Sequence, residues 1–196
     1  MLASITPLGE RGRNNRWSRT AVSHIAGTAA AATAQGAALG GAADAVGLHA
    51  RHTAQIAVLF AAIVAAAIVL DLFGAPPPGL HRQVAESWLD TYRGWVYGGG
   101  FGLQLGLGWA TIVTTWLVWA VLASSLLAGT WSAGALVGLA FGLGRGLPVL
   151  ATRHVDDGVA LRSLHARLAA LEQPFGRASL LVCGGLACTL VAVALR

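Results

Sequence analysis

The feature that most constrains this chain is a stretch of 51 residues, Gly94 to Gly144, without a single Asp, Glu, Lys, Arg or His. One helix needs about 20 apolar residues to cross the hydrocarbon core of a bilayer, so this stretch is long enough for two crossings and a tight turn. The whole chain is 56% hydrophobic and 11% charged, whereas a soluble domain carries roughly 25% charged residues. The sequence therefore predicts an integral membrane protein.

Three further stretches lack Asp, Glu, Lys and Arg; they hold 24, 19 and 18 residues and each is close to one crossing in length. The 51-residue stretch divides best at Gly129-Thr130, before Trp131, a residue type suited to the headgroup level. We predict an all-α, polytopic bundle that forms a single transmembrane domain over residues 1–196. Its five spans are expected near residues 20–48, 53–73, 96–128, 131–150 and 176–195.

A different pattern precedes the last span. Apolar residues recur at spacings of three to five between Val155 and Glu172, with basic residues among them. We predict an amphipathic helix over residues 155–172 that lies at the cytoplasmic surface of the membrane. Pro174 is expected to break this helix before the last span begins.

The arginines predict the orientation, because short cytoplasmic loops carry an excess of basic residues. With the N-terminus inside, ten of the thirteen arginines lie on the inner side and two, Arg51 and Arg196, on the outer side. Arg145, near the inner end of the fourth span, can reach the inner interface through its long side chain. We expect a multi-pass protein of the cell membrane with its N-terminus cytoplasmic and its C-terminus external. The ten inner residues are Arg11, Arg13, Arg16, Arg19, Arg82, Arg93, Arg153, Arg162, Arg167 and Arg177.

The basic N-terminal stretch and the pI of about 10.6 have two other interpretations. Nucleic-acid binding is disfavoured because the arginines are scattered through loops without interleaved aromatic residues. A secretory signal peptide is disfavoured because the apolar stretch after Arg19 exceeds the roughly 7 to 15 residues of a signal core. We expect a retained first span and no nucleic-acid partner.

Glycines recur every fourth residue in the third and fourth spans, which places each set on one helix face. A face without side chains lets two helix backbones approach closely. We interpret these faces as packing surfaces within one chain; a homodimer seam and a sliding surface for conformational change stay open. The glycines are Gly98, Gly102 and Gly106 in the third span and Gly134, Gly138, Gly142 and Gly146 in the fourth.

Hydrophobicity separates the first two spans. The first is rich in Ala and Gly and is too weakly hydrophobic to favour contact with lipid. The second, Ile56 to Leu70, is richer in Val, Ile and Leu and is expected to face lipid more.

Few polar groups lie inside the predicted spans, and these are the candidate functional residues. We predict a polar path formed by Gln35, Gln104, Thr111, Thr114 and Arg145. For the threonines the alternative is a hydroxyl bonded to a carbonyl one turn back in its own helix.

The sequence predicts no catalytic, cofactor-binding or metal-binding residues. Its six histidines form no close set with acidic residues inside a span, and no Ser-His-Asp arrangement or phosphate loop is present. Cys183 and Cys188 are five residues apart in the last span, and a continuous helix separates such positions by a rise of about 7.5 Å and roughly 140° of rotation. That is too far for a disulfide, so we interpret both cysteines as buried packing residues.

Two segments resemble a known family: Gly102 to Thr114 (GLQLGLGWATIVT) and, after a hairpin, Gly134 to Pro148 (GALVGLAFGLGRGLP). They look like the second half of the CcdA/DsbD-type thiol-reductant transporters of cytochrome c biogenesis, members of a LysE-type superfamily. In that family a Gly-Trp-Thr-Pro-Cys segment opens one span and a Gly-Leu-x-Leu-Pro signature ends the next. The resemblance implies two inverted repeats of three spans, here degenerate because the first span is missing, with Thr6-Pro7 as its tail.

The same resemblance implies that the redox chemistry has been lost. Gly108-Trp109 is followed by Ala110-Thr111-Ile112 where the family has Thr-Pro-Cys, and no cysteine stands near Thr6-Pro7. Thiol exchange requires a thiolate at these positions.

Three function classes follow. The first is a cysteine-depleted scaffold or accessory protein for extracytoplasmic redox or maturation reactions, beside a thioredoxin-like or other membrane-protein partner. The second is a small-solute or ion exporter. The third is a structural subunit of a membrane complex, in which a homo-oligomer is an option. In all three the lipid bilayer is the surrounding partner and no cofactor is expected.

Overall fold

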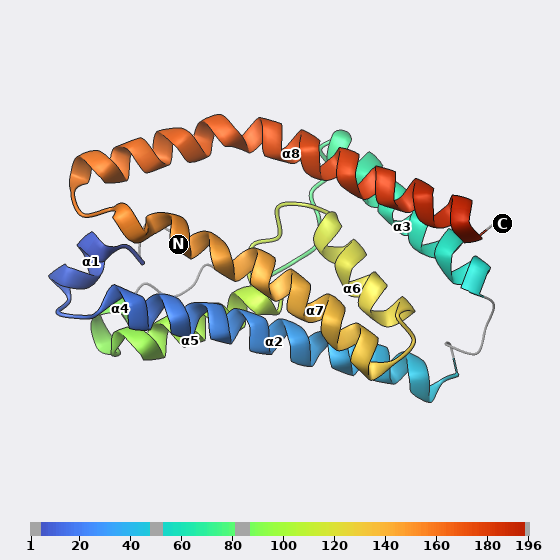
Figure 1. Ribbon diagram of the computed structural model, residues 1–196, viewed down its shortest axis with the longest axis horizontal. Helices are drawn as coiled ribbons and strands as arrows, with labels where there is room; N and C mark the ends of the chain where they lie inside the picture. Colours follow the sequence, from blue (N-terminus) through green and yellow to red (C-terminus); the bar gives the residue numbers. More distant parts are fainter. Residues whose placement is uncertain (1–4, 48–52, 81–86, 195–196) are drawn as a thin grey trace.

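The computed structural model describes residues 5–47, 53–80 and 87–194, and this part of the chain is helical, with no strand. Figure 1 shows an elongated arrangement in which most helices run along the long axis. The predicted span end at Leu48 and the arginines Arg51, Arg82 and Arg196 lie outside the described residues. The elements are α1 (Pro7–Gly12), α2 (Trp17–Ala45), α3 (Thr53–Leu72), α4 (Ser87–Thr91), α5 (Gly94–Gly106), α6 (Leu117–Leu127), α7 (Trp131–Gly146), the 3-10 helix η2 (Leu147–His154) and α8 (Gly158–Ala194).

Helix α2 is the centre of the molecule and packs most extensively against α7 and α5 (Figure 1). Some of its small residues, among them Ala21, Ala32 and Ala43, are buried in these contacts. Along α5, Gly98 lies beside Thr20 and Gly106 beside Thr28, so α5 runs parallel to α2. α7 runs antiparallel to α2, because its glycines approach α2 residues of decreasing number along the chain.

Both glycine faces lie against α2, and the approach is one of backbone to backbone. A Cβ placed on Gly138 would lie 2.8 Å from the carbonyl carbon of Ala32. One placed on Gly134 would lie 3.0 Å from the carbonyl carbon of Gly36, and one on Gly102 would lie 2.9 Å from the amide nitrogen of Thr28. Since real Cβ atoms essentially never come this close to backbone, the residues at these crossings have to be glycine.

Helices α3, α6 and α8 form an outer group beside this core (Figure 1). Val64, Ala67 and Ala120 are buried between α3 and α6, and the rest of α3 is largely uncovered. Only 11% of its apolar segment Gln55–Leu72 is buried. Large apolar side chains such as Leu59 and Val69 are exposed on it. This is the helix whose composition predicts contact with lipid.

Two helical segments of the described chain are long and apolar enough to cross a membrane: Gln55–Leu72, and Trp131–His154, which combines α7 and η2. A bundle of five spans is therefore not confirmed. α2 is long enough, but its many Ala, Gly and hydroxyl residues make it less apolar than these two segments. The predicted third span is not one helix, since its residues form α5 and α6 with irregular backbone between them.

The end of the chain also differs from the prediction. α8 is one helix of 37 residues, Gly158–Ala194, and contains Pro174 rather than ending before it. A proline removes one backbone hydrogen bond and bends a helix, but it does not have to stop it. The amphipathic segment and the predicted last span are thus parts of a single helix that packs on α3.

Candidate functional site

The break between α5 and α6, residues 107–116, is the most distinctive local feature of the long uncharged stretch. α5 ends at a turn in which Gly108 has φ +72°, a conformation open to glycine. Asp71, from the end of α3, then fixes the start of α6. Its carboxylate accepts hydrogen bonds from the Thr115 hydroxyl (2.5 Å) and the Trp116 amide (2.8 Å). A carboxylate at a helix N-terminus is favourable, so Asp71 holds the break in place.

The five residues of the predicted polar path are dispersed around this break. Thr111 is buried, whereas Thr114 is exposed, and neither lies in a helix. The alternative for the threonines, a bond to a carbonyl of their own helix, is therefore wrong for both. Gln104 is half-buried on α5, and Arg145 lies over the ring of Phe141 on α7, 5.4 Å from its centroid. Among the described side chains, no hydrogen bond joins any two of the five.

Three of the five residues of the predicted polar path have a buried polar atom without a hydrogen-bond partner among the described residues. Within the described part of the chain, Gln35 Oε1, Thr111 Oγ1 and Arg145 Nη1 are buried and lack a hydrogen-bond partner, as does His24 Nδ1. Gln35 lines an apolar hollow of about 420 Å³ together with Trp109 and Trp119. Because an unpaired buried polar group costs about 1 to 3 kcal/mol, these atoms are the ones expected to take up water or a polar group.

A second polar cluster, at the other end of α5, has Glu10 at its centre. Glu10 on α1 is fully buried. Its carboxylate accepts hydrogen bonds from the Thr20 hydroxyl of α2 (2.7 Å) and from the Tyr97 hydroxyl of α5, and it pairs with Arg13 at 3.4 Å. The cluster therefore ties together α1, α2 and α5.

The segment before α2 is held in place by further contacts. Ile5 and Thr6 are buried. The Trp17 indole and the Thr152 hydroxyl both donate to the Ile5 carbonyl, at 3.3 Å and 2.8 Å. Thr6 caps α1, with its hydroxyl accepting from the Gly9 amide at 3.1 Å. This cluster was not predicted from the sequence, although Thr-Pro followed by an acidic residue is a helix start signal that predicts α1.

The two cysteines of α8 are free. Cys183 is half-buried against the α3 side, whereas Cys188 is exposed, so the prediction that both are buried is wrong for Cys188. Among the described residues, no group of three or more His, Cys, Asp or Glu side chains could hold a metal ion.

Four relatives share sequence with this chain, and all four carry one name. They are methylamine utilization proteins called MauF. The MauF of Paracoccus versutus is 34% identical over 153 residues, which cover 75% of this chain and 56% of that protein. The MauF of Methylophilus methylotrophus is 34% identical over 153 residues, covering 76% and 53%, and that of Paracoccus denitrificans is 31% identical over 152 residues, covering 75% and 55%.

The chain spans about half the length of the MauF proteins that it matches. No family model matches the chain, and no solved structure matches it significantly.

These matches overturn the family resemblance drawn from the glycine-rich segments. The relatives are MauF proteins and not CcdA/DsbD-type thiol-reductant transporters, so the predicted redox scaffold of cytochrome c biogenesis is wrong. The exporter and the structural subunit gain no support from them either. Both quoted segments contain glycines of the α5 and α7 faces, a pattern that recurs wherever helix backbones approach closely, and such a pattern does not identify a family.

Proposed function

We propose that this chain is a membrane-embedded accessory protein for methylamine utilization. The observation that carries the proposal is the similarity to a MauF protein, which is 34% identical over 153 residues. The aligned residues cover 75% of this chain. About a quarter of the chain lies outside this match.

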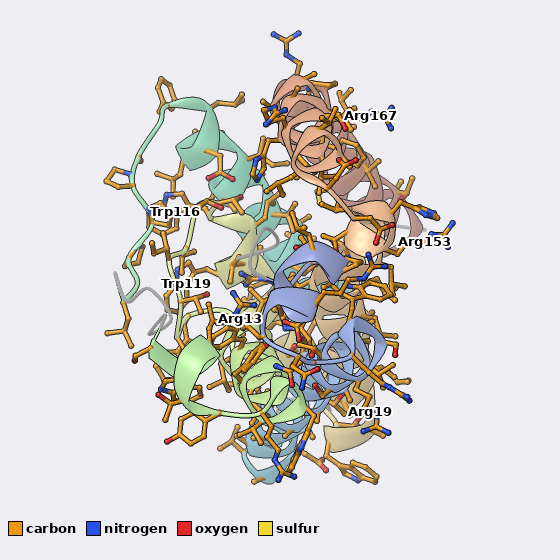
Figure 2. All side chains as sticks on the ribbon, turned by 90° about the vertical axis from the view of Figure 1, so that its left-hand side faces the viewer. Arg13, Arg19, Trp116, Trp119, Arg153 and Arg167 are labelled. Carbon is orange, nitrogen blue, oxygen red and sulfur yellow. The ribbon has the colours of Figure 1, made fainter. Side chains whose placement is uncertain are left out.

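The membrane part of the proposal has its own support. α3 exposes an almost continuous apolar surface, which water does not favour and lipid does. Trp95 and Trp131, exposed by 59% and 64%, lie at opposite ends of α2, as expected for the two interfaces of a bilayer. Charged residues gather at the end where α2 begins (Figure 2), among them Arg13, Arg19, Arg153 and Arg167.

We further propose five crossings, made by α2, α3, the α5–α6 pair, α7 and α8, with the arginine-rich end in the cytoplasm. α5 and α6 hold 13 and 11 residues. Each alone spans less than about 20 Å, whereas the hydrocarbon core is about 30 Å thick, so the two together make one interrupted crossing. A break in a crossing is tolerated where its polar groups are paired within the protein, and here Asp71 of α3 pairs with the Thr115 hydroxyl and the Trp116 amide.

A chimera tests the proposed function. In a strain of Paracoccus denitrificans that lacks its MauF, we would express that MauF with the matched segment replaced by the corresponding segment of this chain. We expect the chimera to restore growth on methylamine, because the matched segment is then supplied within a protein of full length. Growth on another carbon source serves as the control for general fitness.

A second control separates loss of the folded chimera from loss of its function. The chimera carrying Gly138→Leu should reach the membrane in much smaller amounts and fail to restore growth. The proposal would be wrong if the unsubstituted chimera accumulated in the membrane at the level of the natural MauF and the strain still did not grow on methylamine.

A further inference from the structure

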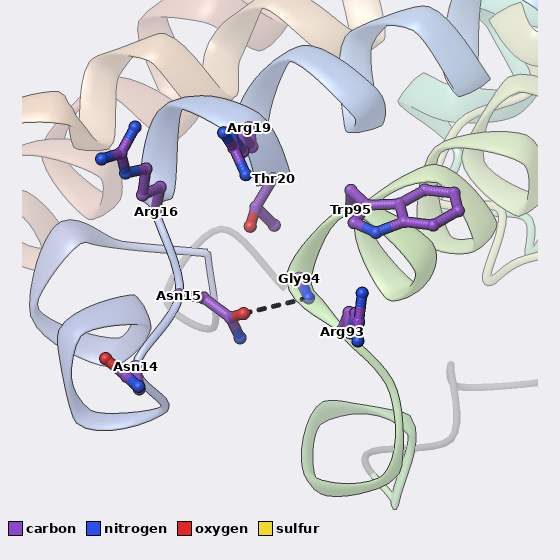
Figure 3. A pocket seen from close by; sticks show the side chains of 8 residues that line it. All are labelled: Asn14, Asn15, Arg16, Arg19, Thr20, Arg93, Gly94 and Trp95. Carbon is purple, nitrogen blue, oxygen red and sulfur yellow. Dashed lines mark hydrogen bonds between the residues drawn. The ribbon is translucent and has the colours of Figure 1, made fainter.

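A pocket of about 270 Å³ opens where α2 and α5 begin (Figure 3). Arg16 and Arg19 reach it from the start of α2, and Arg93 reaches it from the residue before α5. Asn15 and Trp95 also line it. Hereafter we name it the arginine pocket. Two elements that are far apart in the sequence thus bring three cationic side chains to one cavity.

None of the three guanidinium groups has a partner among the described residues. Two ion pairs lie at this end of the molecule, Arg11 with Asp156 and Arg13 with Glu10, and neither involves an arginine of the pocket. The carboxylate of Glu10 lies behind the pocket wall at Gly94, and its charge is offset by Arg13, with which it pairs at 3.4 Å. Three arginines therefore line one cavity, and none of them forms an ion pair with a described residue.

The backbone adds to this charge. The first amides of a helix have no acceptor within the helix and carry partial positive charge. Neither α2 nor α5 has a side-chain cap at its N-cap residue, which is Arg16 in the first and Arg93 in the second. Asn15 Oδ1 accepts the Gly94 amide at 3.3 Å, which fixes the start of α5 against the start of α2.

We propose that the arginine pocket binds a phosphate group. Guanidinium groups present planar pairs of donors that match the oxygens of phosphate. Arg19 lines the cavity from α2 and Arg93 from the residue before α5, whereas the Arg16 side chain is turned away from Arg93 (Figure 3). In the proposed membrane orientation the pocket lies at the cytoplasmic interface, with Trp95 at headgroup level. The phosphate then comes either from an anionic lipid headgroup or from a soluble phosphate compound.

The test uses the purified full chain in nanodiscs and in detergent. In nanodiscs that contain phosphatidylglycerol and phosphatidylcholine, native mass spectrometry measures which lipid stays bound. In detergent, the melting temperature is followed with increasing inorganic phosphate, at constant ionic strength adjusted with chloride. The variant is Arg19→Gln with Arg93→Gln, which changes two exposed residues and leaves the Glu10 cluster intact.

The matched control is Arg167→Gln combined with Arg153→Gln, which removes the same charge from exposed positions at the same end (Figure 2). We expect retention of phosphatidylglycerol or the apparent affinity for phosphate to fall about tenfold or more in the pocket variant and less than about twofold in the control. Retention of the lipid alone assigns the headgroup as the source, and a response to inorganic phosphate assigns a soluble phosphate.

Three results would overturn the proposal: no preference for either phosphate source in the unsubstituted protein, an undiminished preference in the pocket variant, or an equal loss in the control. Because these readouts need no growth on methylamine, they are independent of the chimera experiment. Melting without phosphate shows that the pocket variant is folded.

Discussion

Replacing Gly138 by leucine is expected to remove most of the folded protein, whereas replacing Ala140 by leucine should leave its yield close to that of the unsubstituted chain. Gly138 is buried at the centre of the contact between α7 and α2, and a Cβ there would meet the backbone of Ala32 at 2.8 Å. No rotamer relieves a clash with backbone, so α2 and α7 must separate and lose their contacts along the seam. Ala140 is exposed on the same helix.

The measurement is the detergent-extracted yield and melting temperature of the two variants. Overpacking a core costs typically about 1 to 3 kcal/mol, and a backbone clash falls at or beyond the upper end of this range. For a chain of this size we expect Gly138→Leu to lower the melting temperature by roughly 6 to 12 °C, and Ala140→Leu by less than about 2 °C. Equal behaviour of the two variants would show that the glycine face does not hold α7 against α2.

The second large effect is expected at Glu10. Glu10→Ala leaves the hydroxyls of Thr20 and Tyr97 buried without an acceptor and removes the partner of Arg13 at 3.4 Å. Each unpaired buried hydroxyl costs about 1 to 3 kcal/mol, so the two together cost about 2 to 6 kcal/mol. Glu10→Gln keeps one acceptor oxygen and should cost about half as much. The rate of amide hydrogen exchange in residues 5–13 should increase more in Glu10→Ala than in Glu10→Gln, because the cluster holds α1 in place.

The control for Glu10 is Asp156→Ala. Asp156 pairs with Arg11 at 3.0 Å, but both side chains are more than half exposed, at 54% and 70%. Exposed ion pairs contribute about 0 to 1 kcal/mol, so this change should be nearly neutral. A loss at Asp156 equal to the loss at Glu10 would mean that surface charge, and not the buried cluster, stabilises this end of the molecule.

Features of the fold that depend on residues within one helix could be predicted from the sequence. The fourfold glycine spacing indicates which faces of α5 and α7 lack side chains, and these are the faces that lie against α2 in the structure. The weak hydrophobicity of the first span and the strong hydrophobicity of the second likewise correspond to a central α2 and a peripheral α3. In each case the physical requirement acts on residues within one helix.

The break between α5 and α6 was not predicted from the sequence. Absence of charge defines the long stretch but carries no information about backbone conformation, so one continuous span, residues 96–128, was predicted where the structure has the break. A local signal was present: residues 111–115, Thr-Ile-Val-Thr-Thr, are all β-branched and favour extended backbone after Gly108. The capping of α6 by Asp71, 45 residues before Trp116, is a tertiary contact that no local pattern reveals.

The predicted polar path illustrates the same limit. Its residues were chosen for depth along a span, and depth does not determine the direction of a side chain. Thr114 is exposed while Thr111, three residues earlier, is buried, because the backbone between them is not helical. Glu10 was overlooked for the opposite reason: it lies outside every predicted span, and only the packing of α1 against α2 and α5 buries it.

The claim that the chain crosses a membrane five times, with α5 and α6 sharing one crossing, is tested most directly by labelling single cysteines in intact cells. In a background of Cys183→Ser and Cys188→Ser, one cysteine is placed by Ser132→Cys at the start of α7 and, separately, by Ser163→Cys at the start of α8; both serines are exposed. A membrane-impermeant maleimide should label the first in intact cells and the second only after lysis. Labelling of Ser163→Cys in intact cells, or protection of Ser132→Cys until lysis, would contradict the five-crossing arrangement.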